Sequence, residues 1–344
     1  MSDENIALVT GATGYIAKHV VLELLKSGYR VRGSLRSMHR ADEVRNAVRP
    51  HLDPAFDLDA ALSFVELDLN RDAGWTTALE GIDVLLHTAS PFPIQLPDDE
   101  NELIRPAVDG TLRALNAAQT TGVKRVILTS STAAVTYRDA PADGVEFNEV
   151  DWTDVDHLTC LSYAKSKTLA ERAAWSFVDT ETAGFELTTI NPGFVLGPPL
   201  DKTIGTSMQV ITRLLSARDP ALPNLGFATV DVRDVAKMHV RAIDRSATHG
   251  LRILAVSGFI WFQDLARAIK TAFPKRKIVT RVAPDWLIKV IGLFDKQIRS
   301  ITPNLSKTTS VSNDRASQLL EISFIQPEQS AVDTARYLID HKLS

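Results

Sequence analysis

The sequence has little cysteine, no excess of positive charge and no apolar run long enough to cross a membrane. Cys160 is the single cysteine among 344 residues, which excludes an intramolecular disulfide and a cysteine-based metal site. This usage is typical of a reducing compartment, so we expect a cytoplasmic protein that holds no metal. The formal net charge of −4 provides no electrostatic surface for nucleic acid. Small molecules are therefore the expected partners.

The most apolar late segment, residues 286–294, is far shorter than the roughly 20 residues that a membrane-spanning helix needs. We interpret it as part of a helix from Asp285 to Arg299 that is buried in the core or serves a subunit interface, in a monomer or a homodimer. The acidic start of the chain lacks the basic and apolar regions of a secretory signal. Neither feature indicates a membrane partner.

Short apolar runs alternate with helical patterns through the first 190 residues, which predicts a parallel sheet covered by helices on both faces. We therefore expect an α/β protein with a Rossmann-type doubly wound sheet. Prolines and glycines after Asn191 interrupt the alternation. We assign residues 1–192 plus 229–257 to the dinucleotide-binding domain, and residues 193–228 plus 258–344 to a smaller, mainly helical C-terminal substrate lobe. The predicted strands lie at 6–10, 30–35, 62–67, 84–87, 126–129, 187–190 and 252–256.

A glycine-rich turn joins the first predicted strand to the first predicted helix. Gly11, Gly14 and Ala17 are spaced three apart there. In such a turn the first glycine permits the tight bend, the second lets the backbone approach a pyrophosphate, and the small third residue lets helix and strand pack closely. The helix N-terminus then offers N–H donors and a positive dipole to the anion. The turn predicts a dinucleotide site.

The end of the second predicted strand indicates which dinucleotide fits. An enzyme that uses NAD usually has an acid there for the ribose 2′-hydroxyl, whereas a guanidinium accommodates the 2′-phosphate of NADP. This strand ends without an acid and is followed by Arg36, whose planar fork can bind phosphate through two hydrogen bonds. We therefore expect NADP(H). Asp68, after the third strand, is placed to bond the adenine amino group or to cap its own turn.

Tyr163 and Lys167 are four residues apart in a helical pattern, so their side chains lie on one face. A nearby ammonium favours the phenolate, and we expect Lys167 to bring the pKa of Tyr163 toward neutrality, where acid–base catalysis is efficient. Ser131 follows the predicted strand 126–129 and lies at the carboxyl edge of the sheet, where ligands bind. The three residues predict proton transfer to a carbonyl oxygen.

With these motifs in order, the chain resembles the extended short-chain dehydrogenase/reductases over nearly its full length. The closest resemblance is to the dihydroflavonol 4-reductase-like branch, which includes plant cinnamyl and flavonoid reductases and microbial aldehyde and ketone reductases. The matching segments are residues 9–17, 28–33 with Arg36, 67–69, 87–91, 129–131, 163–171, 191–193 with 197–198, and 230–235.

The resemblance implies NADPH-dependent, reversible reduction of an aldehyde or ketone, with a hydrophobic or aryl carbonyl expected. It implies that Ser131 polarises the carbonyl, Tyr163 donates the proton and Lys167 binds the nicotinamide ribose. The expected cofactor-binding residues are Gly11, Thr13, Gly14, Tyr15, Ile16, Arg36, Asp68, Leu69, Thr88, Ala89, Ser90, Lys167, Pro192, Gly193 and Val195. The expected substrate pocket comprises Pro91, Phe92, Thr136, Phe194, Met208 and Phe227, although an apolar side chain is by default a core residue.

Two departures limit what the resemblance implies. Ala107 stands where many extended members have an asparagine of a proton relay, so that role is not assigned here. Thr136 stands where some flavonoid reductases have an asparagine for a polyphenol hydroxyl, so a flavonoid is not the expected substrate.

Three alternatives share this fold. An NAD-dependent nucleotide-sugar epimerase or dehydratase is opposed by Arg36 and by Thr132 and Ala133, where dehydratases have an acidic pair. A 3β-hydroxysteroid dehydrogenase-like enzyme stays open. A non-catalytic NADP sensor is opposed by the intact Ser131, Tyr163 and Lys167.

Overall fold

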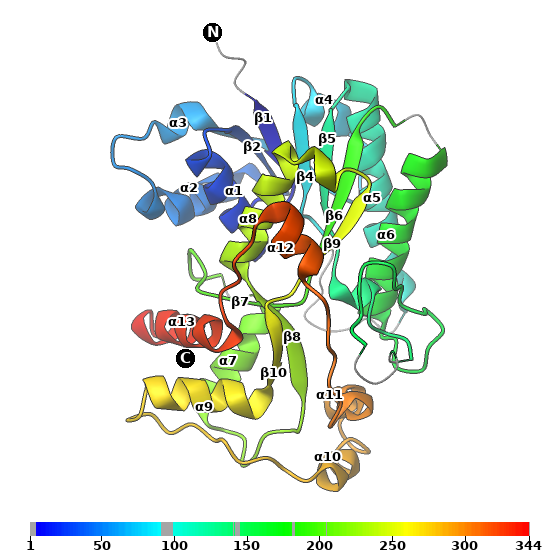
Figure 1. The fold of residues 1–344 in the computed structure, drawn as a ribbon. Helices are drawn as coiled ribbons and strands as arrows, with labels where there is room; N and C mark the ends of the chain where they lie inside the picture. Colours follow the sequence, from blue (N-terminus) through cyan, green and yellow to red (C-terminus); the bar gives the residue numbers. More distant parts are fainter. Residues whose placement is uncertain are drawn as a thin grey trace.

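The large domain is built on a seven-stranded sheet in which every neighbouring pair of strands is parallel. The computed structural model describes residues 5–90, 99–139, 141, 145–180, 183–203 and 205–343. The strand order β3-β2-β1-β4-β5-β6-β9 reverses direction at β1, which is the doubly wound arrangement that the strand–helix alternation predicts (Figure 1). The strands are β1 (Ile6–Val9), β2 (Arg30–Leu35), β3 (Leu62–Glu66), β4 (Val84–His87), β5 (Arg125–Thr129), β6 (Glu186–Pro192) and β9 (Leu251–Ala255).

Helices cover both faces of this sheet because its strands are apolar on both sides. Along β1, Ala7 and Val9 join one core while Leu8 joins the other, as the alternation of side chains along a strand requires. The first core is closed by α1 (Tyr15–Lys26), α2 (Ala41–Val48) and α8 (Val232–Asp244), and the second by α4 (Trp75–Leu79), α5 (Asn101–Thr121) and α6 (Ser162–Thr180). The short helix α3 (Leu58–Ala61) precedes β3.

The smaller lobe contains a second, three-stranded sheet in the order β10-β8-β7, which the sequence pattern did not reveal. Its strands are β7 (Phe194–Leu196), β8 (Gly226–Asp231) and β10 (Gly258–Trp261). The predicted domain boundary at residue 229 therefore falls inside β8. The helices of this region are α7 (Thr206–Ser216), α9 (Phe262–Ala272), α10 (Asp285–Ile291), α11 (Lys296–Ile301), α12 (Asp314–Leu320) and α13 (Pro327–Asp340).

Helix α12 returns to the large domain, although its residues were assigned to the lobe. Ala316 and Leu320 are fully buried in the core that α1 and α8 close over the large sheet. Figure 1 shows α12 beside β9 and α8, away from the lobe's sheet. The chain thus passes between the two parts more often than the sequence indicated, because the lobe is built from several separate segments.

The apolar segment at 286–294 does not belong to one continuous helix, and Ile288 is its one buried apolar side chain, packed with Ala283 and Leu305. Residues 285–299 form two helices, α10 and α11, separated by a turn at Gly292. Trp286 is 66% exposed and Phe294 is 87% exposed, so the prediction of burial in the core is wrong for these residues, while the alternative of a subunit interface stays a prediction. Within the described residues, no helix has the length and apolar character needed to cross a membrane.

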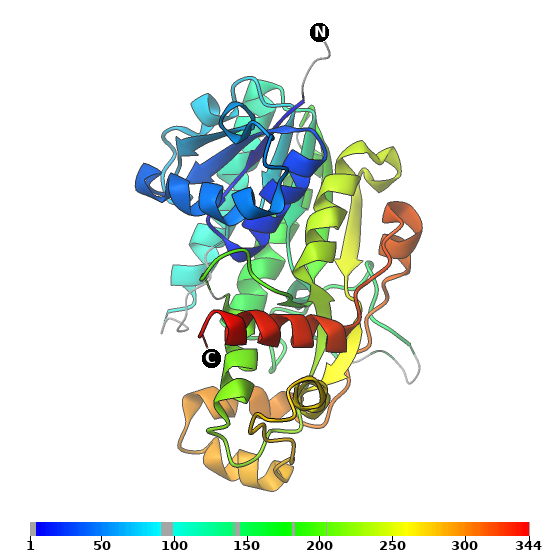
Figure 2. The same cartoon turned by 90° about the vertical axis from the view of Figure 1, so that its left-hand side faces the viewer.

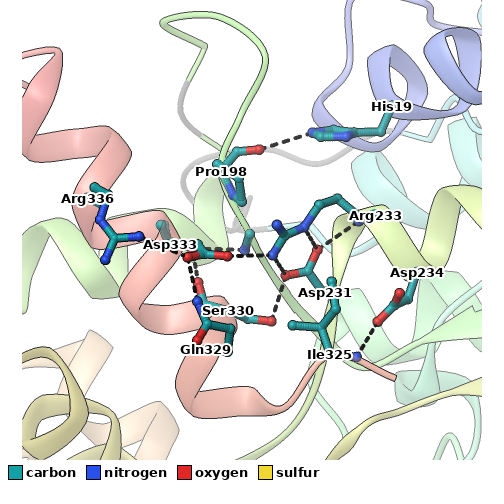
Figure 3. A network of polar contacts seen from close by, with 12 residues as sticks. His19, Pro198, Asp231, Arg233, Asp234, Ile325, Gln329, Ser330, Asp333 and Arg336 are labelled. Atoms are coloured by element: carbon teal, nitrogen blue, oxygen red, sulfur yellow. Dashed lines mark hydrogen bonds and ion pairs between the residues drawn. The ribbon is translucent and has the colours of Figure 1, made fainter. Parts of the chain in front are cut away.

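Charged side chains connect the lobe to the large domain where α13 lies across their junction (Figure 2). The Asp231 carboxylate, at the end of β8, accepts hydrogen bonds from Arg233 and from the Ser330 hydroxyl of α13 (Figure 3). Arg233 also pairs with Asp333 of α13 at 2.9 Å. On the other side, His19 of α1 bonds the carbonyl of Pro198 at 3.1 Å. These contacts fix the segment after β7 against α1, next to the glycine-rich turn.

Candidate active site

The glycine-rich turn has the shape of an anion-binding site. Gly11 has φ +64°, and a Cβ placed there would lie 3.0 Å from the Cβ of Ala89. Its N–H donates to the Ser34 hydroxyl at 3.0 Å, which ties the turn to β2. Helix α1 then begins at Tyr15 with no side-chain cap on Gly14 and no acidic residue in its first turn. An uncapped, acid-free helix N-terminus beside a closely packed turn fits a dinucleotide phosphate.

The loop after β4 is held against this turn by one hydroxyl. Thr10 Oγ1 accepts the N–H groups of Thr88 and Ala89 at 3.1 and 3.0 Å. It lies 3.0 Å from Nδ1 of the buried His87. Because the Thr10 hydroxyl already accepts two hydrogen bonds, we infer that its own proton goes to His87 Nδ1, which places the histidine proton on Nε2. Ser90 ends the described part of this loop, and Pro91 and Phe92 lie outside the described residues.

Arg36 is exposed directly after β2 and makes no hydrogen bond or ion pair with any other described residue. Arg40, nearby, is instead bound to Glu43 through two nitrogen atoms. Arg36 is therefore the guanidinium at this strand end that is available to a 2′-phosphate. Asp68 accepts the N–H of Asn70 at 3.0 Å, so it caps its own turn.

The remaining predicted cofactor residues surround the turn and the carboxyl ends of β3 and β6. The Tyr15 hydroxyl donates to the Gly197 carbonyl at 2.7 Å, and burial raises its pKa well above the usual value. Ile16 packs against the core beneath the turn, and Thr13 is half-buried beside it. Leu69 follows β3, and Pro192 ends β6. The Gly193 N–H donates to the Ala255 carbonyl at 3.0 Å, and Val195 is buried in β7.

Ser131, Tyr163 and Lys167 come together at the carboxyl end of β5. Ser131 follows β5, and its hydroxyl accepts the N–H of Ala133 at 3.1 Å and lies 3.4 Å from the Pro192 carbonyl. The same hydroxyl is hydrogen-bonded to the side chain of Tyr163. Lys167 lies one turn further along α6 and is buried. Ser131 and Tyr163 are therefore in contact, and Lys167 lies on the next turn of the helix that carries Tyr163.

The pKa of Tyr163 differs from the expectation. Burial raises it to about 12, and the hydrogen bond from Ser131 offsets only part of that effect. Burial also lowers the pKa of Lys167 to about 8, and the charge of Glu171 acts against that effect. The prediction of a near-neutral tyrosine pKa is wrong for the protein alone, since the sequence does not show how deeply the hydroxyl is buried. Tyr163 is thus a protonated phenol at neutral pH.

A small cavity lies between Lys167 and the loop after β4. Lys167, Ala89, Ser90, His87 and Glu171 are among its lining residues. It therefore places two predicted cofactor residues of that loop next to the lysine expected to bind the nicotinamide ribose.

The predicted substrate wall is only partly assembled. Phe194 and Phe227 stack with ring centres 4.5 Å apart, and both are half-buried against the core of the lobe. Met208 is fully buried, so in this structure it is a packing residue and lines no open wall. Thr136 donates to the Thr132 carbonyl at 3.2 Å and is half-buried.

Sequence reasoning missed a buried polar network behind the cluster. Glu171, Asn191 and Arg252 are each at most 7% exposed and are hydrogen-bonded to one another through the Glu171 carboxylate. Arg252 carried a signal in the sequence, because it interrupts the otherwise apolar strand β9 at a position where a buried charge needs a partner.

Residues 7–254 match the model of the NAD dependent epimerase/dehydratase family. The chain belongs to this family. It is 35% identical over 285 residues to a cinnamoyl-CoA reductase of Medicago truncatula, covering 82% of this chain and 85% of that protein. It is 34% identical over 286 residues to the NADPH-dependent methylglyoxal reductase of Saccharomyces cerevisiae, covering 78% of this chain and 83% of that protein.

The crystal structure of the yeast methylglyoxal/isovaleraldehyde reductase complexed with NADPH has the same fold over 98% of this chain and 99% of that chain, with a TM-score of 0.80 at 29% identity. The resemblance to the extended short-chain dehydrogenase/reductases and to their reductase branch is therefore confirmed, as is the Rossmann-type fold.

Proposed function

We propose that this protein reduces an aldehyde or ketone to the alcohol with NADPH, and that Ser131, Tyr163 and Lys167 carry the proton transfer. The observation that carries the proposal is the hydrogen bond between Ser131 and Tyr163 at the carboxyl end of β5, with Lys167 one turn away. Relatives above 30% identity are named as reductases, two of them NADPH-dependent, which supports the same reaction class.

The residues that would hold NADPH are those of the turn and the strand ends. The α1 N-terminus and Gly11 would receive the pyrophosphate, and Arg36 the 2′-phosphate. Lys167 would donate to the nicotinamide ribose from the buried end of the site. When bound, NADPH supplies the hydride for the carbonyl carbon.

The protein's own residues act on the carbonyl oxygen. Ser131 would donate a hydrogen bond to it and increase the polarity of the carbonyl, while Tyr163 would pass its proton to the oxygen as negative charge develops. Because burial keeps the pKa of Tyr163 at about 12, the phenol holds its proton at neutral pH and is ready for the reductive direction. Oxidation of the alcohol needs the phenolate and is therefore favoured at high pH.

A hydrophobic carbonyl compound is the substrate class that the nearby side chains favour. Phe194 and Phe227 present stacked aromatic faces in β7 and β8, and Gly193 links β6, which ends beside Ser131, to β7. Apolar and aromatic walls with a few polar groups at one end are typical of small-molecule sites. We propose that these two rings contact the substrate's apolar part.

An assay of purified protein tests the proposal. The protein is incubated with NADPH, and separately with NADH, together with short aldehydes, aryl ketones, keto esters or nucleotide sugars. We expect carbonyl-dependent oxidation of NADPH, with much slower oxidation of NADH. Tyr163→Phe should lose turnover while it still binds NADPH, whereas the control Tyr337→Phe, on α13, should retain turnover. Activity only with nucleotide sugars and tightly held NAD would overturn the proposal in favour of an epimerase.

A further inference from the structure

We infer that Glu171, a carboxylate outside the predicted catalytic set, is a positioning residue that fixes Ser131 relative to Tyr163 and Lys167. The inference rests on the proposed function, because the three residues that it concerns carry the proton transfer. Glu171 lies on α6, one helical turn beyond Lys167 and two turns beyond Tyr163. Its side chain is fully buried, with a relative exposure of 0%.

Hydrogen-bond donors surround both oxygens of this carboxylate. Oε1 accepts from Arg252 Nε at 2.7 Å and lies 3.0 Å from the Thr189 hydroxyl. Oε2 accepts from the Ser130 hydroxyl at 2.5 Å and from Asn191 Nδ2 at 2.7 Å. An environment made of donors and one guanidinium is what a buried carboxylate requires. Glu171 is therefore held in one orientation by groups from β5, β6 and β9.

Arg252 supplies the opposite charge and is itself fixed. Its Nη1 donates to the carbonyl groups of Glu149 and Asp151 at 3.0 and 2.6 Å. Its guanidinium carbon lies 3.7 Å from the centre of the Trp152 ring. Because the arginine is anchored on backbone and aromatic groups, the ion pair gives Glu171 a fixed position relative to the sheet.

Two routes connect Glu171 to Ser131. Asn191 Nδ2, which bonds Glu171, also donates to the Ser131 carbonyl at 3.2 Å. Ser130, the preceding residue in the chain, bonds Glu171 directly. A single carboxylate on α6 thus holds the backbone at Ser131, and the same helix carries Tyr163. The distance between the serine and tyrosine hydroxyls is set through this carboxylate.

Glu171 also controls the charge beside Lys167, since both residues line the cavity behind the site. Burial lowers the pKa of Lys167 to about 8, and the charge of Glu171 raises it against that effect. His87 on β4, whose pKa burial lowers to about 3, also faces this lysine, and Tyr163, whose pKa burial raises to about 12, lies one turn before it on α6. Helix α5 contributes the uncharged Thr111. Among these described groups, Lys167 alone titrates near pH 8.

The test replaces Glu171 with glutamine, which keeps its size and removes its charge. We expect kcat of carbonyl reduction to fall on the order of tenfold to a hundredfold, because the serine and tyrosine lose their fixed spacing. Without the carboxylate, Lys167 loses its proton at lower pH, so the alkaline limb of the kcat profile should move toward acid by about one pH unit or more. Trp175→Phe is the matched control, because it removes one 3.3 Å hydrogen bond to Glu171 and keeps the charge. It should leave that limb in place.

A direct titration makes the result independent of turnover. The NMR signal of lysine labelled with carbon-13 at Cε, identified as the one missing in Lys167→Arg, should titrate at lower pH in Glu171→Gln than in the wild type. This readout separates failure of the inference from failure of the proposed reaction, since it needs no substrate. An unchanged titration in a folded Glu171→Gln protein would overturn the part of the inference that assigns Glu171 control of the charge beside Lys167.

Asn191→Leu keeps the test decisive if Glu171→Gln does not fold, since it removes the direct side-chain link to the Ser131 carbonyl and keeps the Glu171–Arg252 pair and the Ser130–Glu171 bond. It should lower kcat at least tenfold without moving the alkaline limb, because the charge stays in place. Activity within twofold of the wild type would overturn the positioning role.

Discussion

Replacing Gly11 with alanine adds a single methyl group at the phosphate turn. The residue has φ +64°, where an alanine costs roughly 1–2 kcal/mol more than a glycine. The new Cβ would also lie 3.0 Å from the Ala89 Cβ and 3.3 Å from its Cα, which forces the turn and the loop after β4 apart by a few tenths of an ångström. Both segments belong to the proposed cofactor site, so the distortion falls on the groups that receive the pyrophosphate.

Gly28→Ala is the matched control. Gly28 has φ +85° at the end of α1, and a Cβ there would meet no atom within 4 Å. The control therefore has a similar backbone cost without the contact and far from the proposed site. Both variants should unfold at slightly lower temperature than the wild type, and Gly11→Ala should lose the most.

Fluorescence titration with NADPH separates the two variants. We expect the Kd of Gly11→Ala to rise at least about tenfold, which corresponds to about 1.4 kcal/mol of binding energy. The Kd of Gly28→Ala should stay within about twofold of the wild type, a difference of about 0.4 kcal/mol. Tight NADPH binding by Gly11→Ala, or equal weakening in both variants, would refute the assignment of the turn as the phosphate site.

Further predictions concern cofactor choice and a buried ion cluster. Arg36→Ser should raise the KM for NADPH about tenfold to a hundredfold and leave the KM for NADH unchanged, because one charged hydrogen-bonding group contributes about 1.5–3 kcal/mol. Equal changes in the KM of both cofactors in steady-state kinetics would contradict the role of Arg36 in binding the 2′-phosphate. Lys18 is 2% exposed and pairs with Glu43 and Asp201. Lys18→Met should lower the free energy of unfolding by about 1–3 kcal/mol in urea titrations. This loss is smaller than for a fully buried pair, because the two carboxylates are 28% and 21% exposed. Burial raises the pKa of Glu43, but hydrogen bonds and charges from Lys18 and Arg40 together hold it below its usual 4.5. Its ionised form therefore stabilises the wild type above about pH 4.5, and this contribution is lost as the pH falls through the lowered pKa. The urea midpoint of Lys18→Met should consequently fall less on acidification than that of the wild type, and an equal acid loss would show that Lys18 does not set the pKa.

The large sheet and the catalytic cluster were predictable because their signals are local. Short apolar stretches that alternate with helical patterns mark the strands of the large sheet. The spacing of Tyr163 and Lys167 places them on one helical face without knowledge of the fold. The small sheet was missed because β7 has only three residues and because its strands come from segments that lie far apart in the sequence, outside the regular alternation of strands and helices.

The features that depend on distant contacts were not predictable. Glu171 and Arg252 are 81 positions apart, and only the packing of α6 on the sheet brings them together. The raised pKa of Tyr163 has the same origin, since burial of its hydroxyl is produced by the folded chain. Helix α10 carries an apolar pattern that is typical of a core helix, yet Trp286 is exposed, because periodicity alone does not say what covers a face.

The most direct test of the proposed reaction is to follow deuterium from NADPH labelled at C4 into the alcohol formed from a hydrophobic aldehyde or ketone. We expect one deuterium on the carbinol carbon when the transferred position carries the label, and none when only the opposite face is labelled. Tyr163→Phe should bind the labelled cofactor and form little or no product. Product without deuterium from either label, or undiminished turnover in Tyr163→Phe, would contradict hydride transfer from NADPH with Tyr163 as the proton donor.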